Sequence, residues 1–500
     1  MNGARLKIEN DPYDYMDFSA GYDGDANLLK RKKDSNFNFG LSYPISENFN
    51  IDISYIKGNT INFTFSMGFA LNKNYQKKQS SMPNVQKTNP SGNKKLAFYR
   101  DLLRNLNSNN LLLQSADLND ERLKIVINQD TYQNSLQAAS YSGYVAKKVA
   151  DNNNIPIKTI SISEYNSGSV LNSITFLSKD LNEQTIYKNL INRNTIFDSG
   201  DPNLLSNSEY LPKVEFPNFF YSIEPKILSH VGTPDKFYYG GLALSFASEV
   251  QFNRNLYLNS EIMHNIVDNF DRKDSFTDSP FLPNVRTEVV DYLKGSDTYI
   301  TLLELNFFKQ FKKDIYTKLS AGIFERMYGG IGGEILYKPF DSNFSYGASV
   351  HFVKKRDFDQ RFSFKDYETE TGHITVSHFL PSLSMLSSVS FGRYLAEDSG
   401  FTLDFSRLFD NGGRAGFFFS LTDISFEEFG EGSFDKGFYF NFPLDIFSQN
   451  YNRSNSGFKL RPLTRDGGAK LEISKPLIDI MHSSSMIEIN QRYFWNEFLY

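Results

Sequence analysis

The sequence predicts a mainly β protein that combines an antiparallel outer-membrane-type β-barrel, a small α+β domain and the last strands of an incomplete first barrel. Three observations lead to this prediction. Apolar and polar residues alternate in many segments, and most of these segments are near the length of about ten residues that crosses a bilayer at a tilt. Aromatic residues make up 15% of the chain although its mean hydropathy is −0.43. A barrel produces this combination because residues that face lipid alternate with residues that face the interior.

Residues 49–71, FNIDISYIKGNTINFTFSMGFAL, contain the clearest alternation. Large apolar residues occupy every second position in both halves, and Gly58-Asn59 between them suits the tight turn of a hairpin. A half-buried sheet in a soluble sandwich gives the same alternation. The polar positions, however, hold mainly Asn, Thr, Ser and Gly rather than Lys and Glu. This choice of residues favours a crowded barrel interior over a face exposed to solvent.

The first part of the chain is predicted to be strands of an incomplete amino-terminal barrel over residues 1–75. Residues 37–45 read as a strand that precedes the hairpin. The opening MNGARLKIEN has no basic start followed by an apolar segment, so no secretory signal is visible. Because this opening resembles the middle of a strand, we expect the natural amino end to lie further upstream. A polar stretch broken by Pro and Gly then predicts a linker at 76–95.

The spacing of apolar residues changes after the linker from that of strands to that of helices. Leucines and aromatic residues fall on one helical face, and short strands lie between the helical segments. This order predicts a small α+β domain over 96–200, which we place in the periplasm, and a connector at 201–215. The predicted helices are 96–106 and 132–152, and the predicted strands are 123–128, 155–162 and 169–177.

Alternation returns near the end of the connector and predicts a carboxy-terminal barrel over 216–480, followed by a tail at 481–500. Turn signals rich in Asp, Asn, Ser and Gly separate the segments. We count roughly 12 to 14 strands, within the range of closed membrane barrels. Closure removes open edges and keeps backbone polar groups paired in lipid. The clearest predicted strands are 298–308, 315–324, 344–353, 384–395, 401–405, 414–424 and 434–444.

Composition excludes several classes of protein. No window of about 18 apolar residues exists, so the sequence contains no membrane-spanning helix. The formal net charge of −5 is small for 500 residues and argues against a nucleic-acid partner. The six histidines match no ligand spacing for a metal ion, and Gly329–Gly333 lacks the Lys that a phosphate-binding loop needs. We therefore expect no metal, no cofactor and no catalytic residue.

Charged and polar residues inside predicted strands are the candidates for functional contacts. A base on the lipid side of the midplane would cost about 2–4 kcal/mol, so such residues should point inward or lie near the interface. The block 354–361 carries the most charge. Its groups would hydrogen-bond sugar hydroxyls, or they would form a salt-bridged rim where a strand leaves the membrane. The residues expected to line the lumen or contact sugar are Glu304, Asn306, Glu334, Arg356, Asp357, Asp359, Arg361, Arg393, Asp404 and Arg414.

Six distinctive blocks follow one another in the second half of the chain. They are LPNVRTEVVDYLKGSD (282–297), ERMYGGIGGEILYKPF (325–340), KKRDFDQRFSFKDYETETGH (354–373), SRLFDNGGRAGFFFSLTD (406–423), EEFGEGSFDKGFYF (427–440) and RPLTRDGGAKL (461–471). Together with the α+β region and LSYPI (41–45), these blocks resemble the YjbH family of exopolysaccharide-biosynthesis proteins over nearly the whole chain. Members of that family carry a signal peptide and an amino-terminal barrel region that this chain mostly lacks.

The resemblance implies an envelope protein with β-barrel domains, encoded with machinery that makes and exports an extracellular polysaccharide, and with no established enzymatic step. The expected partners are extracellular polysaccharide, outer-membrane lipids and other polysaccharide-export proteins of the envelope. The expected location is the outer membrane, with a periplasmic domain, and the expected context is capsule or biofilm formation. Two alternatives stay open. One is a hydrolase or lyase that modifies polysaccharide with paired carboxylates such as Asp357 and Asp359, and the other is a structural barrel with a filled lumen.

Overall fold

The computed structural model describes thirteen stretches of the chain, and all structural statements below concern these residues. The chain divides into two compact units, residues 1–73 with 231–238 and residues 74–230 with 239–500, and each unit is considered by itself. The described stretches are 3–12, 33–46, 49–68, 82–87, 93–133, 135–182, 194–231, 238–272, 282–409, 411–429, 433–448, 450–462 and 465–489.

The first unit contains a four-stranded antiparallel sheet in the order β1-β2-β3-β4. The predicted hairpin is confirmed as β3 and β4, although its two left-handed residues are Lys57 (φ 60°) and Gly58 (φ 72°) rather than Gly58-Asn59. The positive φ angles fit the tight turn that matches the twist of the strands. The strands are β1 (Arg5–Asn10), β2 (Phe37–Ser46), β3 (Phe49–Ile56) and β4 (Thr60–Met67).

The apolar side chains of this small sheet are aligned across its strands and are exposed. Leu6 lies opposite Leu41, Leu41 opposite Ile53, and Ile53 opposite Phe63. All four side chains are exposed. A sheet that buried its apolar residues against a soluble core would not leave such a row open.

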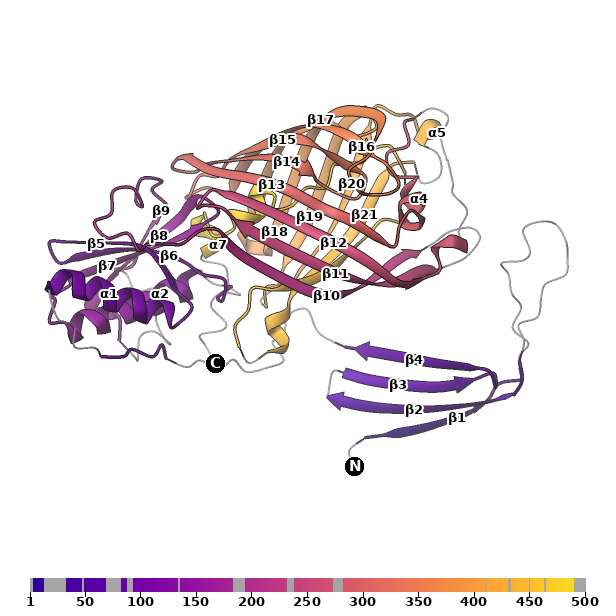
Figure 1. Cartoon of the computed structure of the whole chain (residues 1–500), viewed down its shortest axis with the longest axis horizontal. Coiled ribbons are helices and arrows are strands. Elements are labelled where there is room, and N and C mark those ends of the chain that lie inside the picture. Colours follow the sequence, from indigo (N-terminus) through magenta and orange to yellow (C-terminus); the bar gives the residue numbers. More distant parts are fainter. Residues whose placement is uncertain are drawn as a thin grey trace. The chain divides into compact units, whose positions relative to one another are not determined.

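The second unit begins with the predicted α+β domain, whose two helices pack on one face of a five-stranded sheet (Figure 1). Only β6 and β7 pair in parallel, because α2 connects them. The strand at 112–119 has no predicted counterpart, and the strand predicted from 155 begins instead at Thr159, after Pro156. The elements are α1 (Lys94–Asn107), β5 (Leu112–Asn119), β6 (Arg122–Asn128), α2 (Ser135–Asn152), β7 (Thr159–Asn166), β8 (Ser169–Leu177) and β9 (Ile196–Ser199).

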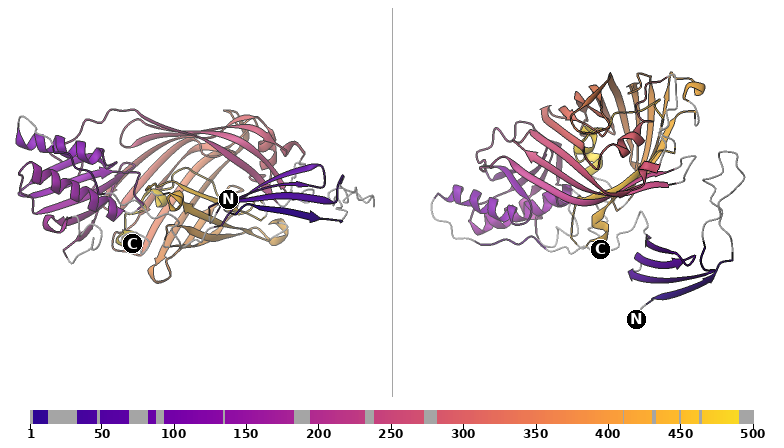
Figure 2. Two further views of the ribbon diagram at one scale, coloured as in Figure 1. Left: turned by 90° about the horizontal axis from the view of Figure 1, so that it is seen from below. Right: turned by 45° about the vertical axis from the view of Figure 1, so that its right-hand side comes forward.

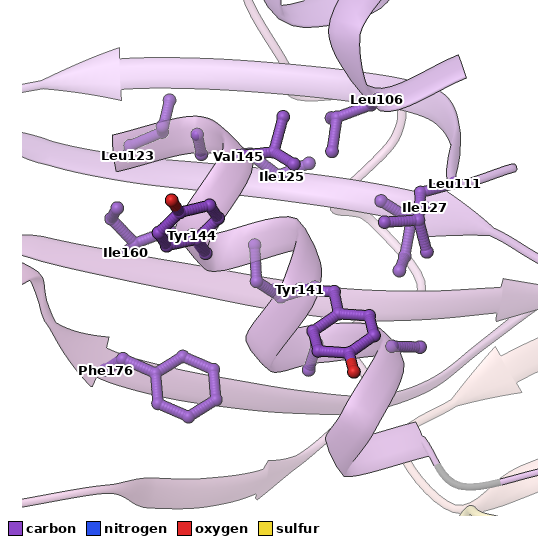
Figure 3. Packing of buried hydrophobic residues seen from close by; sticks show 14 of the residues in the cluster. Leu106, Leu111, Leu123, Ile125, Ile127, Tyr141, Tyr144, Val145, Ile160 and Phe176 are labelled. Carbon is purple, nitrogen blue, oxygen red and sulfur yellow. The ribbon is translucent and has the colours of Figure 1, made fainter. Parts of the chain in front are cut away.

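This domain has the ordinary core of a soluble protein. Tyr144 of α2 lies beside Ile160 of β7, and Val145 lies beside Ile125 of β6 (Figure 3). Tyr141 belongs to the same cluster, and all five side chains are buried. Apolar side chains therefore lie between the helices and the sheet, and burying them is the main source of the domain's stability.

The rest of the second unit is a 13-stranded antiparallel sheet that follows chain order from β10 to β22 and curves strongly (Figures 1 and 2). This number lies within the predicted count, and all seven of the clearest predicted strands are confirmed. The strands are β10 (Asn218–Val231), β11 (Tyr238–Gln251), β12 (Leu256–Asp268), β13 (Thr298–Lys312), β14 (Ile315–Ile323), β15 (Tyr328–Tyr337), β16 (Phe344–Arg356), β17 (Phe364–Leu380), β18 (Met385–Arg393), β19 (Ser399–Leu408), β20 (Arg414–Thr422), β21 (Asp435–Pro443) and β22 (Asn455–Leu460).

The polarity of the two sheet faces is the reverse of that in a soluble protein. Along β14, Leu319 is 62% exposed, whereas Lys318 is fully buried and Ser320 nearly so. Along β13, Leu305 and Phe307 are exposed while Glu304 is fully buried. We call the face that carries Lys318 and Glu304 the inner face, and the opposite, apolar face the outer face.

Two expectations about the large sheet need correction. Within the described residues, β10 and β22 stand at the two ends of the strand order and do not pair, so the sheet is not a closed barrel. The strands also end at Leu460 rather than near 480. Residues 465–489, which we call the C-terminal segment, contain only the short helices α6 (Leu477–Ile480) and α7 (Met486–Ile489). The part of the predicted tail beyond residue 489 lies outside the described residues.

Short helical turns connect some of the strands, and none of the helices in the described stretches is both long and apolar enough to span a membrane. These turns are η2 (Ser178–Asp180), η3 (Phe270–Arg272), α4 (Val289–Lys294), η4 (Pro381–Leu383), α5 (Phe426–Phe429) and η5 (Leu444–Phe447).

Candidate functional site

The C-terminal segment lies on the inner face of the large sheet, inside its curve (Figure 2). Its backbone is held by side chains of several strands. The Ser474 N–H donates to Glu304 of β13 at 3.0 Å, and the Leu477 N–H donates to Glu334 of β15 at 3.0 Å. Apolar residues of the segment, including Leu477 and Met481, are buried against Phe308 and neighbouring residues of β12–β15. The segment therefore fills part of the space that the sheet surrounds.

A buried ion pair supports this contact. Lys318 Nζ lies 3.0 Å from Glu304 Oε1, and both side chains are fully buried. The Lys318 ammonium also donates to the Ser474 carbonyl oxygen. Lys318 and Glu304 thus pair with each other and with the backbone of the segment. Buried charges require such partners because no solvent reaches them.

The beginning of the C-terminal segment is held by a carboxylate that accepts four hydrogen bonds. Asp466 accepts from the N–H groups of Val285, Arg286 and Thr287 at 2.7, 2.7 and 3.1 Å, and from the Thr287 hydroxyl at 2.8 Å. Arg286 forms a two-point ion pair with Glu325 and also donates to the Lys470 carbonyl oxygen at 2.7 Å. These contacts join three loops that are distant in the sequence.

The same junction explains the charged block at 354–361. Arg356 is fully buried, and its guanidinium donates to the carbonyl oxygens of Ile300, Glu325, Arg326 and Arg361 at 2.8–3.1 Å. Four of the six distinctive blocks, 282–297, 325–340, 354–373 and 461–471, therefore meet in one place. Charged residues of these blocks, such as Arg286 and Arg356, hold the loops together.

A cavity of about 1080 Å³ lies between β15–β22 and the C-terminal segment. Hydroxyl groups line much of its wall. Thr375 and Ser390 are within 2.9 Å of each other across β17 and β18, and Thr402 and Ser420 are within 2.8 Å across β19 and β20. Hydroxyl groups of this kind both donate and accept hydrogen bonds, which is the capacity that sugar hydroxyls require.

Asp404, Arg414 and Tyr439 form one charged and aromatic corner of the cavity. The Tyr439 hydroxyl donates to Asp404 at 2.7 Å. The Arg414 guanidinium lies 5.6 Å from the centre of the Tyr439 ring, and its Nε donates to the Ser406 hydroxyl at 2.9 Å. Gly416 lies opposite Tyr439 in the β20–β21 register, and a Cβ at Gly416 would lie 2.5 Å from Tyr439 Cζ. Glycine is needed at this position because the ring lies directly on the backbone.

Basic residues gather beside this corner. Lys459 and Arg461, from β22 and just after it, lie 5.0 and 5.5 Å from the ring centre of Phe418. Each also faces an acid, since Lys459 lies 3.4 Å from Glu472 and Arg461 lies 3.9 Å from Asp435. Lys470, from the C-terminal segment, also lines the cavity. Burial lowers the pKa of Lys470 to about 8, and the nearby Asp404 carboxylate only partly opposes this shift.

The structure separates the ten residues that were expected to line a lumen. Glu334, Asp404 and Arg414 border the cavity. Glu304 and Asn306 lie on the inner face but are fully buried, and Ser474 of the C-terminal segment contacts both. All five share the inner face.

The remaining five residues are not on the cavity wall. Asp357 and Asp359 accept hydrogen bonds from backbone N–H groups of their own turn, and Arg361 is exposed. Arg356 is enclosed by carbonyl oxygens. Arg393 belongs to the outer face near the end of β18, where it pairs with Glu370 and Glu397 at 3.2 and 3.3 Å.

Several residues of the site were not identified from the sequence. Tyr439, Lys459 and Lys470 line the cavity, and a signal existed for the first two. Tyr439 alternates with exposed Phe438 and Lys459 with exposed Phe458, which marks both as inward-facing. Lys470 lies in a segment without strand structure, so alternation carried no information about it.

Within the stretches that the structure describes, no three histidine or acidic side chains lie close enough together to hold a metal ion. The cavity wall presents hydroxyl groups, aromatic faces and charged side chains, which suit a polar organic ligand.

Comparison with known proteins places this architecture in context. The family model YjbH, described as "Exopolysaccharide biosynthesis protein YbjH", matches residues 1–483. The chain is 30% identical over 499 residues to the "Uncharacterized lipoprotein YjbH" of Escherichia coli (strain K12), covering 96% of this chain and 69% of that protein.

Two solved outer-membrane proteins are also similar, at low scores. One is a loop-deletion mutant of OmpT of Vibrio cholerae, with 10% identity, a TM-score of 0.24, and coverage of 49% of this chain and 93% of the other. The second is OmpF of Salmonella typhi in complex with daunomycin, with 8% identity, a TM-score of 0.26, and coverage of 49% of this chain and 96% of the other.

Proposed function

The chain belongs to the YjbH family of exopolysaccharide biosynthesis proteins, and on this premise we propose that it is an outer-membrane protein whose large sheet carries an extracellular polysaccharide along its inner face. The α+β domain would lie in the periplasm. Lipids would cover the outer face, and other export proteins of the envelope would deliver the polysaccharide, in the context of capsule or biofilm formation.

One observation carries this proposal. The inner face is polar and buried while the outer face is apolar and exposed, as Lys318 and Leu319 illustrate on adjacent positions of β14. Water does not favour such an arrangement, whereas a bilayer does. The α+β domain of the same chain has the opposite polarity, with its apolar residues inside, so the reversal is specific to the sheet.

We propose that the passage is passive and that the chain is not an enzyme. The carboxylates available to a hydrolase are already engaged: Asp404 by the Tyr439 hydroxyl, Glu334 by the Leu477 N–H, and Asp435 by Arg461. Hydroxyl groups and aromatic faces offer many weak contacts instead of one deep trap, which lets a chain of sugars move.

Two adjacent residues of β18 provide a test. Ser390 borders the cavity, whereas Val389 is exposed on the outer face. A Ser390→Trp variant would place an indole ring in the cavity and narrow it, and a Val389→Trp variant would place the same ring in lipid. Each variant is expressed in a deletion strain, and polysaccharide is measured outside the cell and in the periplasm.

The proposal expects the deletion strain and Ser390→Trp to retain polysaccharide in the periplasm, while Val389→Trp restores secretion. Both variants must be recovered from the outer membrane at wild-type levels. Normal secretion with Ser390→Trp would indicate a structural barrel with a filled lumen. A changed polysaccharide length without retention would indicate a hydrolase or lyase.

A further inference from the structure

Lys470 differs from the neighbouring Lys459 and Arg461 in the way its charge is balanced. Lys459 and Arg461 each face a carboxylate, Glu472 and Asp435 respectively. Among the described residues, no carboxylate lies within ion-pair distance of Lys470. The acid nearest to it in electrostatic effect is Asp404, and that carboxylate already accepts from Tyr439 and interacts with Arg414 and Lys459.

The position of Lys470 is fixed, although its ammonium group has no ion-pair partner in the part of the chain that the structure describes. Its carbonyl oxygen accepts from Arg286 at 2.7 Å. The preceding residues are also held, since the Ala469 carbonyl accepts from the Leu395 N–H at 3.0 Å and the Gly468 N–H donates to Asp398 at 2.7 Å. The backbone thus presents one surplus positive charge to the cavity at a defined place.

We infer that the cavity binds an acidic polysaccharide and that the Lys470 ammonium is the counter-ion for its carboxylate groups. This inference rests on the proposed function and specifies the class of its ligand. The hydroxyl wall of β17–β20 would take the neutral sugar hydroxyls, and the exposed part of the Tyr439 and Phe418 corner would take the apolar faces of the rings.

The protonation of Lys470 fits this role. With its pKa lowered to about 8, the Lys470 amine is mostly protonated at neutral pH. Its buried surroundings nevertheless disfavour the charged form. A carboxylate brought by the ligand would favour the charged form. The charged and titratable groups that face it are Asp404 of β19, Lys459 of β22 and His373 of β17, and none of them supplies that anion within ion-pair distance.

The test compares an acidic and a neutral oligomer of equal length. The full chain, purified in detergent micelles, is titrated calorimetrically with oligogalacturonate and with malto-oligosaccharide, in low salt and at neutral pH. The same titrations are made with Lys470→Gln. The control is Lys158→Gln, which removes an equal charge from an exposed position of the α+β domain.

We expect the wild-type chain to bind the acidic oligomer about tenfold more tightly than the neutral one, because a hydrogen bond to a charged partner is stronger than one between neutral groups. Lys470→Gln should remove this preference and leave affinity for the neutral oligomer unchanged, and Lys158→Gln should alter neither. Preference for the acidic oligomer should also decline as the pH rises above 8. Loss through unfolding is checked by the thermal transition, which Lys470→Gln should not lower.

Equal affinity of the wild-type chain for the two oligomers would overturn the inference and leave the proposed function standing. A preference that persists in Lys470→Gln would overturn the role of Lys470. Failure of both oligomers to bind, with the chain folded, would count against the proposed function as well.

Discussion

Glu304 and Lys318 are both fully buried, and their 3.0 Å ion pair depends on a detail of strand register. Directly opposite Glu304 in β14 is Gly322, and directly opposite Lys318 in β13 is Phe308. The pair therefore forms diagonally, past Asn306 and Ser320, which lie opposite each other between the two charged residues. Alternation in the sequence placed Glu304 on the inner face, but it did not reveal Lys318 as its partner, because register is not encoded locally.

Removing one member of this pair should destabilise the protein strongly. We expect Lys318→Met to cost about 3–5 kcal/mol, because it leaves the Glu304 carboxylate buried without its counter-charge. Adding Glu304→Gln should recover part of that loss, since it removes the second charge of the pair, whereas Glu334, opposite Lys318 in β15, keeps its charge. The free energy of unfolding in detergent micelles, measured by denaturant titration, checks both changes. The matched control is Lys158→Met, whose exposed pair with Glu121 should be worth less than about 1 kcal/mol.

At the scale of single elements, the C-terminal segment is where sequence-based prediction failed. The predicted barrel extends to 480, whereas the last strand ends at Leu460. The structure instead places the backbone N–H groups of Glu472, Ser474 and Leu477 on the carboxylates of Glu325, Glu304 and Glu334. A segment whose hydrogen bonds go to side chains of distant strands leaves no local signal, and Pro476 prevents it from continuing as a paired strand.

Strands and helices elsewhere were predictable because their signals are local. The hairpin at 49–67 and the strands from 298 onward carry strict alternation and turn residues, and α1 and α2 carry helical spacing. The strand at 112–119 was missed because its middle, QSAD, is polar although Ser115 and Ala116 are buried. Tertiary contacts decide the structure of such a segment.

The end of the C-terminal segment should respond to mild acid. Burial lowers the pKa of His482 from its ordinary value of 6.5, and Lys338 and Arg453 add to this effect, while Glu488 and Glu164 oppose it. The folded segment therefore holds His482 neutral. As the pH falls below 6.5, His482 binds a proton when the segment is released from the inner face, but not when the segment is docked there. Docking therefore weakens by up to about 1.4 kcal/mol per pH unit until the pKa of His482 in the docked segment is reached.

Hydrogen exchange of residues 477–489, corrected for intrinsic rates, checks this prediction. Protection should fall between about pH 7.5 and about pH 5.5, and His482→Gln should remove most of that dependence. Glu488 does not explain a change in this range. Burial would raise its pKa, but Lys338, His482 and a hydrogen bond from Ser485 together outweigh burial and hold that pKa below the ordinary value, so the Lys338–Glu488 pair is lost only at lower pH. Equal pH dependence in His482→Gln would assign the effect to another group.

At the scale of the whole molecule, one chain combines two opposite rules for placing apolar residues. In the α+β domain, Leu102 and Ile125 are fully buried. In the large sheet, Leu319 of β14, Ile331 of β15 and Ile374 of β17 are exposed, while Glu304 and Lys318 face inward and are buried. Composition already suggested this division, because many aromatic residues occur with a negative mean hydropathy. It did not indicate that the C-terminal segment would occupy part of the interior.

Two exposed leucines distinguish lipid from water as the surroundings of these two parts. Leu319 of the large sheet is 62% exposed and Leu112 of β5 in the α+β domain is 46% exposed, so both lie in strands and neither is in a core. If the outer face lies in lipid, Leu319→Arg should cost about 2–4 kcal/mol near the midplane. Leu112→Arg should cost less than about 0.5 kcal/mol, because its surroundings are aqueous. Folding into lipid vesicles, followed by heat-modifiable migration in electrophoresis and by denaturant titration, measures both. A small effect at both positions would mean that water or another protein, rather than hydrocarbon, covers the outer face, and the assignment of the large sheet to the membrane would then be wrong.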